Sequence, residues 1–224
     1  MSPISLKVKS VIFDMDGVIT NTMPDHCSSW KSVLREEGLD IASEDIYKRE
    51  GQSGLSALKD IFREHQKVFD EESGTLILKK KEELFRAIVR IRFIVGARSF
   101  LKHLHKSDIR LGLVTGTSRC ELRKILPDVL CNLFSVIVTG NDVKEGKPHP
   151  EPYEKSLQGL GIASNEAVVI ENAPFGIQAA KQAGLKCFAL ATSLPHQYLS
   201  KADDVFLSMK ELRSKVNFVS LGES

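Results

Sequence analysis

This sequence lacks several features that mark other protein classes. No apolar run approaches the ~20 residues that a membrane-spanning helix needs. Residues 1–6 have neither the basic flank nor the apolar stretch of a secretory signal. The cysteines are few, namely Cys27, Cys120, Cys131 and Cys187. Their wide separation does not match metal-site spacing and indicates free or buried thiols in a reducing compartment. We therefore predict a cytoplasmic protein with no membrane partner.

A large charge of one sign is also missing. The formal net charge is +2 with 27% charged residues, without the strong basic field typical of nucleic-acid-binding proteins. The basic run at residues 79–81 is most simply a solvated helix face. Because 42% of the 224 residues are hydrophobic, the chain can bury a sizeable core. We therefore expect no nucleic-acid partner. A monomer is our default expectation, because the sequence does not determine the oligomeric state.

Short apolar runs rich in β-branched residues recur along the chain. They cover residues 8–13, 111–115, 136–139, 168–170, 187–190 and 205–207. Helix-length amphipathic stretches separate most of them, and strands alternating with helices form right-handed crossovers and a parallel sheet. We therefore predict the α/β class, with a Rossmann-like parallel sheet core and helices on both faces.

One interval in this alternation has no clear strand. It runs from the end of the first apolar run to about Phe93, and apolar residues at helical spacing predict helices near residues 24–37, 55–62 and 84–91. Gly38 can end the first helix. An insert after the first strand would stand above the carboxyl ends of the strands, where parallel sheets bind ligands. We predict a core from residues 1–20 and 96–224, with residues 21–95 as an inserted all-helical cap.

Two aspartates end the first apolar run. Asp14 and Asp16 stand where the strand should stop, and Gly17 permits an abrupt change of chain direction. Both carboxylates can then face one crevice. Two solvated loop aspartates would be the ordinary interpretation, so the decision depends on what the other strand ends carry.

Further polar groups follow the second and third runs. Thr115 puts a hydroxyl at a strand end, and the backbone N–H groups after it can bind an anion. Ser118 and Glu121 fit a capping box, which is compatible with ligand binding by Thr115. Lys147, held between a glycine and a proline, can present its ammonium group to a phosphate or to a buried carboxylate. Taken alone, it would more often be an exposed lysine.

The fourth run ends on Glu171 and Asn172. Asn172 could instead be a helix N-cap before Pro174, and Glu171 a loop acid favoured by the helix dipole. Together with Asp14 and Asp16, these residues offer the hard oxygen ligands that suit Mg²⁺.

These motifs occur in order on successive strand ends. They are residues 14–20 (DMDGVIT), Thr115, residues 146–148 (GKP) and residues 171–172 (EN). Together they resemble the four motifs of the haloacid dehalogenase superfamily. The helical insert resembles the cap of its phosphatase and β-phosphoglucomutase branch.

The resemblance implies a mechanism and a cofactor. Asp14 would attack phosphorus to give an aspartyl-phosphate, while Asp16 protonates the leaving oxygen and later activates water. Thr115 and Lys147 would hold phosphoryl oxygens. Mg²⁺ would be bound by Asp14, the backbone carbonyl of Asp16 and Asn172, with Glu171 nearby or through water. The family more often has Asp where this chain has Asn172, so we expect weaker Mg²⁺ binding.

The resemblance also directs attention to the cap loop at residues 50–55. Substrate contacts are expected at His26, Gly51, Ser53, Gly116 and Thr117. Mutases typically have Arg where this chain has Gly54, which favours a phosphatase of a small phosphorylated metabolite, with a sugar phosphate as the first choice. A β-phosphoglucomutase-like mutase is the alternative. A catalytically silent regulatory or binding protein on the same scaffold is the third possibility.

Overall fold

Six parallel strands form the central sheet of the computed structural model, which describes residues 3–222. The strands are β2 (Ser10–Phe13), β3 (Arg110–Val114), β4 (Val136–Val138), β5 (Ala167–Glu171), β6 (Lys186–Leu190) and β7 (Asp204–Phe206). Their order across the sheet is β4-β3-β2-β5-β6-β7, so β2 lies in the interior of the sheet. The predicted α/β class is confirmed, and each of the six predicted runs overlaps one of these strands.

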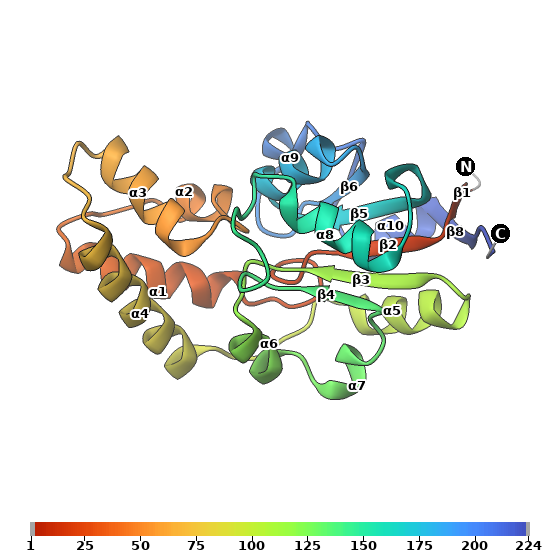
Figure 1. The fold of residues 1–224 in the computed structure, drawn as a ribbon, viewed down its shortest axis with the longest axis horizontal. Coiled ribbons are helices and arrows are strands. Elements are labelled where there is room, and N and C mark those ends of the chain that lie inside the picture. The colour runs from red at the N-terminus through yellow and green to blue at the C-terminus, as the bar shows by residue number, and fades with distance from the viewer. Residues whose placement is uncertain (1–2, 223–224) are drawn as a thin grey trace.

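Helices cover both faces of this sheet. They are α5 (Ala97–Lys106), α6 (Arg119–Ile125), α7 (Asp128–Cys131), α8 (Glu151–Leu160), α9 (Pro174–Gln182) and α10 (Met209–Lys215), with the 3-10 helices η1 (Ser164–Glu166) and η2 (His196–Leu199). Side chains alternate along β2, so Val11 and Phe13 pack in the cluster of α5, α6 and α10, whereas Ile12 packs with α8 and α9. Figure 1 shows α9 above the sheet and α5 below it. The apolar core therefore fills both sides of the sheet.

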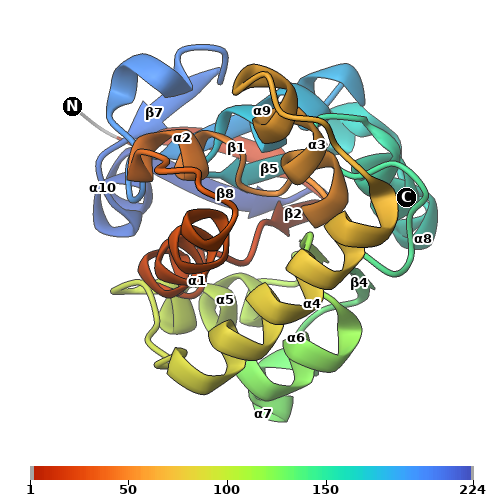
Figure 2. The same cartoon turned by 90° about the vertical axis from the view of Figure 1, so that its left-hand side faces the viewer.

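Four helices form a cap between β2 and α5. They are α1 (Met23–Glu36), α2 (Ser43–Lys48), α3 (Gly54–Glu64) and α4 (Glu71–Ile88). Figure 1 shows them at the left-hand end of the molecule, and Figure 2 looks onto α1 and α4 from that side. The cap has an apolar cluster of its own, which includes Val33, Leu34, Leu58 and Ile61. It can therefore pack as a unit separate from the core of the sheet.

The sequence predicted the cap helices incompletely. The expected helices at residues 24–37 and 55–62 match α1 and α3, but the third expected helix covers only the end of α4. The start of α4 is set by a polar signal, because the Asp70 side chain accepts a hydrogen bond from the Ser73 N–H at 2.8 Å. Helix α2 was not predicted, since it is six residues long and buries only Ile46.

Two paired segments join the cap to the core. The Asn21 N–H donates to the Arg92 carbonyl at 2.8 Å, and the Ile94 N–H donates to the Ile19 carbonyl at 2.9 Å. The two crossings therefore lie side by side, as in a hinge. We propose that the cap spans residues 21–95 and moves about these paired segments.

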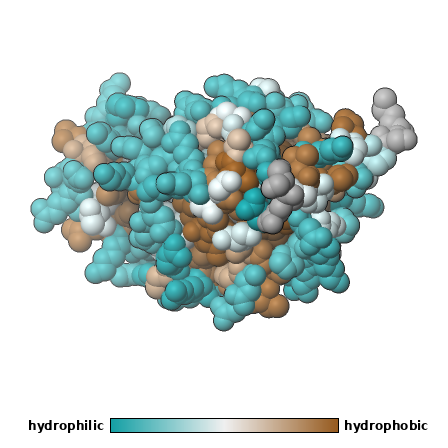
Figure 3. All heavy atoms as spheres, turned by 45° about the vertical axis from the view of Figure 1, so that its right-hand side comes forward, coloured by the Kyte–Doolittle hydropathy of each residue, from teal (hydrophilic) through white to brown (hydrophobic). Residues whose placement is uncertain are grey.

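A second, two-stranded parallel sheet was missed. It joins β1 (Ile4–Val8) to β8 (Val216–Ser220), near the two ends of the chain. The prediction that Val8 belongs to the first strand of the main sheet was wrong, because Val8 ends β1 and Lys9 separates it from β2. Figure 3 shows apolar side chains at the surface beside the chain ends, and Ile4 is 67% exposed. Within residues 3–222, no helix has the length and apolar character needed to cross a bilayer.

Candidate active site

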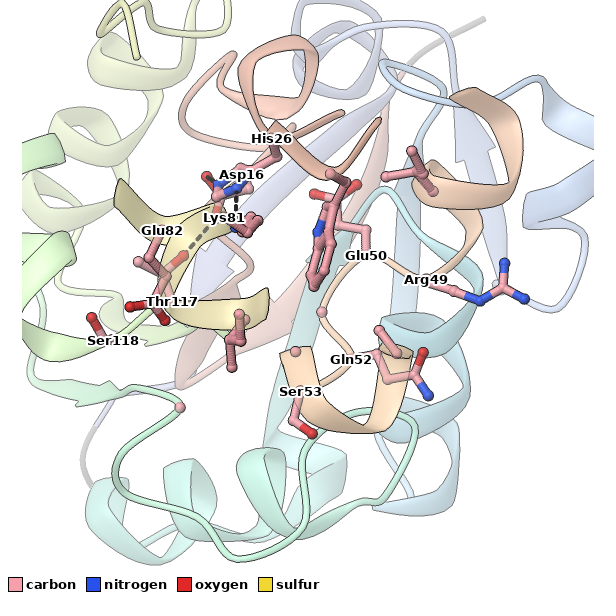
Figure 4. A pocket seen from close by; sticks show the side chains of 18 of the residues that line it. Asp16, His26, Arg49, Glu50, Gln52, Ser53, Lys81, Glu82, Thr117 and Ser118 are labelled. Carbon is pink, nitrogen blue, oxygen red and sulfur yellow. Dashed lines mark hydrogen bonds and ion pairs between the residues drawn. The ribbon is translucent and has the colours of Figure 1, made fainter. Parts of the chain in front are cut away.

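A cavity of about 270 Å³ lies between the cap and the carboxyl ends of the strands. Side chains that line it include Asp14, Asp16, Glu50, Lys81 and Thr117. Figure 4 shows Asp16 and His26 beside Lys81, and Glu50 on the neighbouring cap loop. The two aspartates therefore face one crevice, as the sequence predicted from the shared edge of parallel strands.

Asp14 follows β2 directly and is 3% exposed. Its backbone N–H donates to the Ile170 carbonyl at 3.0 Å, which holds it at the strand end. Its Oδ1 accepts a hydrogen bond from Lys147 Nζ at 2.6 Å, whereas its buried Oδ2 has no hydrogen-bond partner. Burial raises the pKa of Asp14 to about 8, with Lys147 opposing and Glu171 adding to the rise. Asp14 is thus a carboxylate that needs a further positive partner to stay ionised.

Lys147 joins Asp14 to Glu171. Its Nζ lies 2.6 Å from Glu171 Oε1 as well as from Asp14 Oδ1, and the residue is 2% exposed. Burial alone would lower the pKa of Lys147, but Asp14 and Glu171 outweigh it and hold that pKa above its usual range. The interpretation of Lys147 as an exposed lysine is wrong, because its ammonium group is the counter-charge of two buried carboxylates.

Both oxygens of Glu171 already have hydrogen-bond donors. Tyr153 Oη donates to Oε1 at 2.8 Å, and the backbone N–H groups of Asn172 and Ala173 donate to Oε2 at 2.8 and 3.2 Å. Glu171 is the last residue of β5 and is 1% exposed, so the alternative interpretation as a loop acid is wrong. Its place in a metal site stays a prediction, because the contacts favour a role as the anchor of Lys147. Tyr153 was missed, since only packing shows that α8 points its hydroxyl inward.

Asp16 is held by hydroxyl groups and an imidazole. Its Oδ1 accepts a hydrogen bond from the Thr22 hydroxyl, its Oδ2 accepts one from Thr117 Oγ1 at 3.0 Å, and His26 Nε2 lies 3.6 Å from Oδ1. Burial raises the pKa of Asp16, but His26, Thr22 and Thr117 outweigh it and bring that pKa to about 2. Gly17 turns the chain here with a φ of 89°. Asp16 is therefore ionised when the cavity holds no substrate.

His26 is part of a buried row on the cap side of the cavity. Lys81 Nζ lies 3.0 Å from His26 Nδ1, and the His26 ring stacks on Phe85 with 3.8 Å between ring centroids. Burial lowers the pKa of His26, Lys81 lowers it further, and Asp16 opposes both. The prediction of a solvated face at residues 79–81 was wrong for Lys81, which is 7% exposed. Its position one turn before Phe85 on α4 was the available signal.

All five residues expected to contact substrate line the cavity, namely His26, Gly51, Ser53, Gly116 and Thr117. The Ser53 hydroxyl also has a structural role, because it accepts a hydrogen bond from the Ser56 N–H at 3.3 Å and so caps α3. Their roles toward a substrate stay predictions.

Two charged residues of the cap loop point in different directions. Figure 4 shows the Arg49 guanidinium directed away from Asp16, and this group donates to Glu64 and to the Asp45 carbonyl. Glu50 is 8% exposed, and burial together with Asp14 raises the pKa of Glu50 well above its usual range. The sequence did not single out Glu50, because an acidic residue in a polar loop usually faces water.

Asn172 does not cap a helix. The N-cap of α9 is Ala173, and Asn172 Nδ2 donates to Glu50 Oε2 at 2.8 Å and to Ser193 Oγ at 3.0 Å. Its buried Oδ1 has no partner, and neither has Asp14 Oδ2. Two such hard oxygens, both expected as metal ligands, fit a Mg²⁺ ion. Within residues 3–222, no three His, Cys, Asp or Glu side chains lie close enough together to form a metal site. A metal ion here would therefore also need the backbone carbonyl of Asp16 and the amide oxygen of Asn172 as ligands.

Comparison with known proteins agrees with this geometry. The haloacid dehalogenase-like hydrolase family model matches residues 11–190. The validoxylamine A 7′-phosphate phosphatase of Streptomyces hygroscopicus subsp. limoneus is 29% identical, over 92% of this chain and 96% of that protein. The phosphorylated carbohydrates phosphatase of Thermotoga maritima is 30% identical, over 80% and 83%. The crystal structure of β-phosphoglucomutase from Clostridium difficile matches with a TM-score of 0.80 at 26% identity, over 92% and 96%. This chain therefore belongs to the haloacid dehalogenase-like hydrolase family.

Proposed function

We propose that this chain is a Mg²⁺-dependent phosphatase that hydrolyses a small phosphorylated metabolite, with a sugar phosphate as the first choice. The observation that carries the proposal is the Asp14 carboxylate. One of its oxygens is fixed by Lys147 at 2.6 Å, the other is unpartnered, and Asp16 lines the same cavity. A positioned nucleophile beside a second carboxylate is what phosphoryl transfer through a covalent intermediate requires.

The two aspartates would divide the chemistry. An oxygen of Asp14 attacks phosphorus, the bond from phosphorus to the ester oxygen breaks, and Asp16 gives that oxygen a proton. Asp16 then takes a proton from water, whose oxygen attacks the aspartyl-phosphate to release phosphate and restore Asp14. Contacts with His26 and with the Thr22 and Thr117 hydroxyls lower the pKa of Asp16 and keep it ionised without substrate. The negative phosphoryl group of a bound substrate would raise the pKa of Asp16 and so favour its protonation.

Other groups would neutralise and orient the phosphoryl oxygens. Thr115, Gly116 and Lys147 line one small cavity, and the Gly116 N–H follows the Thr115 hydroxyl. The Thr117 N–H donates to Thr115 Oγ1 at 3.1 Å and so orients that hydroxyl. Mg²⁺, held by Asp14, the Asp16 backbone carbonyl and Asn172, would stabilise negative charge on the phosphoryl group. A cap that closes over these groups excludes water from the cavity.

The phosphatase is preferred to the mutase on substrate contacts. A mutase must grip a second phosphate, and Gly54 offers no side chain for that purpose. The ion pair of Arg49 with Glu64 argues against Arg49 as a substitute for the missing arginine. The curated relatives named above are phosphatases, whereas the structural similarity to a β-phosphoglucomutase keeps the mutase as the second candidate. The cytoplasmic location and the monomeric state stay predictions.

The test separates the three candidates. Purified protein with Mg²⁺ is given a panel of hexose and pentose phosphates, including β-glucose 1-phosphate with a trace of its bisphosphate. Free phosphate and isomerised sugar phosphate are measured side by side, with Asp14→Asn as the blank. Phosphate release that disappears in the blank supports the phosphatase, and isomerised product without phosphate release supports the mutase. No turnover of the panel or of para-nitrophenyl phosphate with any divalent metal supports the silent binding protein.

A further inference from the structure

A carboxylate of the cap reaches the part of the core where the cation is expected. Glu50 lies in the loop between α2 and α3, lines the same cavity as Asp14, and is 8% exposed. Its Oε2 accepts the hydrogen bond from Asn172 Nδ2 at 2.8 Å, which joins the cap to the end of β5. Its Oε1 is buried and has no hydrogen-bond partner. Glu50 thus has one oxygen fixed on the core and one free.

The charges around Glu50 do not balance. Lys147 forms ion pairs with Asp14 and Glu171, and among residues 3–222 no basic side chain forms an ion pair with Glu50. Figure 4 shows Glu50 on the loop with Arg49 directed elsewhere. Buried carboxylates are ordinarily paired with a cation or coordinate a metal, because leaving an isolated charge out of water is costly. The site is therefore short of positive charge at Glu50.

Several buried oxygens around the cavity have no hydrogen-bond partner, including Gln52 Oε1 and Glu121 Oε1. Three others come from the expected metal ligands and from the residue bonded to one of them, namely Asp14 Oδ2 after β2, Asn172 Oδ1 after β5 and Glu50 Oε1 in the cap loop. We propose that Glu50 supplies a carboxylate from the cap to the divalent-cation site, so that binding the cation holds the cap loop against the core. This inference rests on the metal site of the proposed function, and it adds a ligand that comes from the cap.

The residue at position 172 supports this assignment. An aspartate there would place a second carboxyl group in contact with Glu50, and the two would repel each other whenever both are ionised. Asn172 donates a hydrogen bond to Glu50 instead and keeps one oxygen free for the cation. Asn172 is a neutral ligand, and Glu50 would supply the negative charge that an aspartate at position 172 would have supplied. In this assignment the neutral ligand comes from the core and the charged ligand comes from the cap.

The test measures metal binding without substrate. Mg²⁺ binding is followed by calorimetry and Mn²⁺ binding by electron paramagnetic resonance, for wild type and Glu50→Gln. Glutamine keeps an oxygen that can accept from Asn172, so the change removes charge but not the hydrogen bond. We expect Kd to rise about tenfold or more, since ligand charge count tunes affinity at such sites. Glu82→Gln is the matched control, because Glu82 lines the same cavity and forms no hydrogen bond with Asn172. Its Kd should equal that of wild type.

Two further measurements examine the position of the charge and the movement of the loop. Adding Asn172→Asp to Glu50→Gln returns a carboxylate to the site and should recover most of the lost affinity. Hydrogen exchange of residues 50–54 should slow when Mg²⁺ alone is added to wild type, and should not change in Glu50→Gln. Thermal melting of each variant verifies that it is folded. Recovery of Mg²⁺ affinity in the double variant would also show that Glu50→Gln did not lose affinity by unfolding.

Each outcome separates this inference from the proposed function. If Glu50→Gln binds Mg²⁺ and Mn²⁺ as tightly as wild type, Glu50 is not a ligand and the inference is overturned. If affinity falls equally in Glu82→Gln, the effect is general charge and the inference is again overturned. A wild-type protein that binds Mg²⁺ through Glu50 but releases no phosphate would contradict the proposed function and leave the inference standing.

Discussion

Replacing Lys147 with methionine removes the positive charge between two buried carboxylates and keeps most of the apolar stem. In the folded protein, Lys147 Nζ lies 2.6 Å from Asp14 Oδ1 and from Glu171 Oε1. The side chains of Lys147 and Asp14 are 2% and 5% exposed, and that of Glu171 is 1% exposed. Water can therefore replace little of what the ammonium group provides.

The expected cost follows from this burial. Removing one partner of a buried ion pair typically destabilises a protein by about 3–5 kcal/mol. We expect about 3 kcal/mol for Lys147→Met at pH 7, at the lower end of that range, because Asp14, with its pKa raised to about 8, is largely protonated at that pH and adds little unpaired charge. The loss should be nearly the same at pH 5, since Asp14 stays protonated in the folded protein over this interval. Adding Glu171→Gln removes a second charge and should recover roughly 1–2 kcal/mol.

Urea denaturation in the presence of a chelator measures these differences. Lys155→Met is the matched control, because Lys155 is 41% exposed and pairs with Glu151 on the surface of α8. Exposed ion pairs contribute about 0–1 kcal/mol, so the control should stay within that range. A loss below 1 kcal/mol for Lys147→Met, equal to the control, would refute the claim that Lys147 is the counter-charge of the site.

Two further predictions concern pH and the cap loop. Burial raises the pKa of Asp14 from 3.8 to about 8, so the folded protein holds this proton more tightly than the unfolded chain does. Without metal, the free energy of unfolding should therefore fall as the pH rises from about 4 to about 8. Thermal melts of Asp14→Asn should lack the part of this fall that comes from Asp14. If the melting temperatures of wild type and Asp14→Asn change in parallel with pH, the prediction is wrong. Gly51 has a φ of 80°, and a Cβ there would lie 2.6 Å from Lys147 Cδ. Gly51→Ala should lower kcat/KM for phosphate release about tenfold by keeping the loop off the core, whereas Gly161→Ala, with a φ of 63° and open space around it, should leave activity unchanged.

Much of the site follows from where polar residues stand relative to the strands. Parallel strands share one carboxyl edge, so Asp14, Thr115 and Glu171 had to come close to one another once their runs were recognised as strands. Gly17 has the positive φ that the turn after Asp16 requires. These features depend on local pattern and on the rule that side chains at strand ends face the crevice.

Other features depend on contacts between segments far apart in the chain. The pairing of β1 with β8 joins residues more than 200 positions apart, and no local periodicity encodes it. Lys81 is buried because α4 packs against α1, and this packing places Lys81 beside His26, whereas the sequence shows it only as one lysine of a basic run. The direction of the Glu171 carboxylate depends on Tyr153 and on two backbone N–H groups that only the folded chain brings together.

The sequence by itself determined the α/β class, the helical insert and the row of polar residues at the strand ends, because hydrophobic periodicity and strand direction act locally. Only the tertiary structure decided what each carboxylate contacts. Asn172 looks like a weakened metal ligand in the sequence, and in the fold it holds Glu50 of the cap at 2.8 Å. The physical reason is that a buried charge is defined by its neighbours, and those neighbours come from segments that the chain brings together only when it folds.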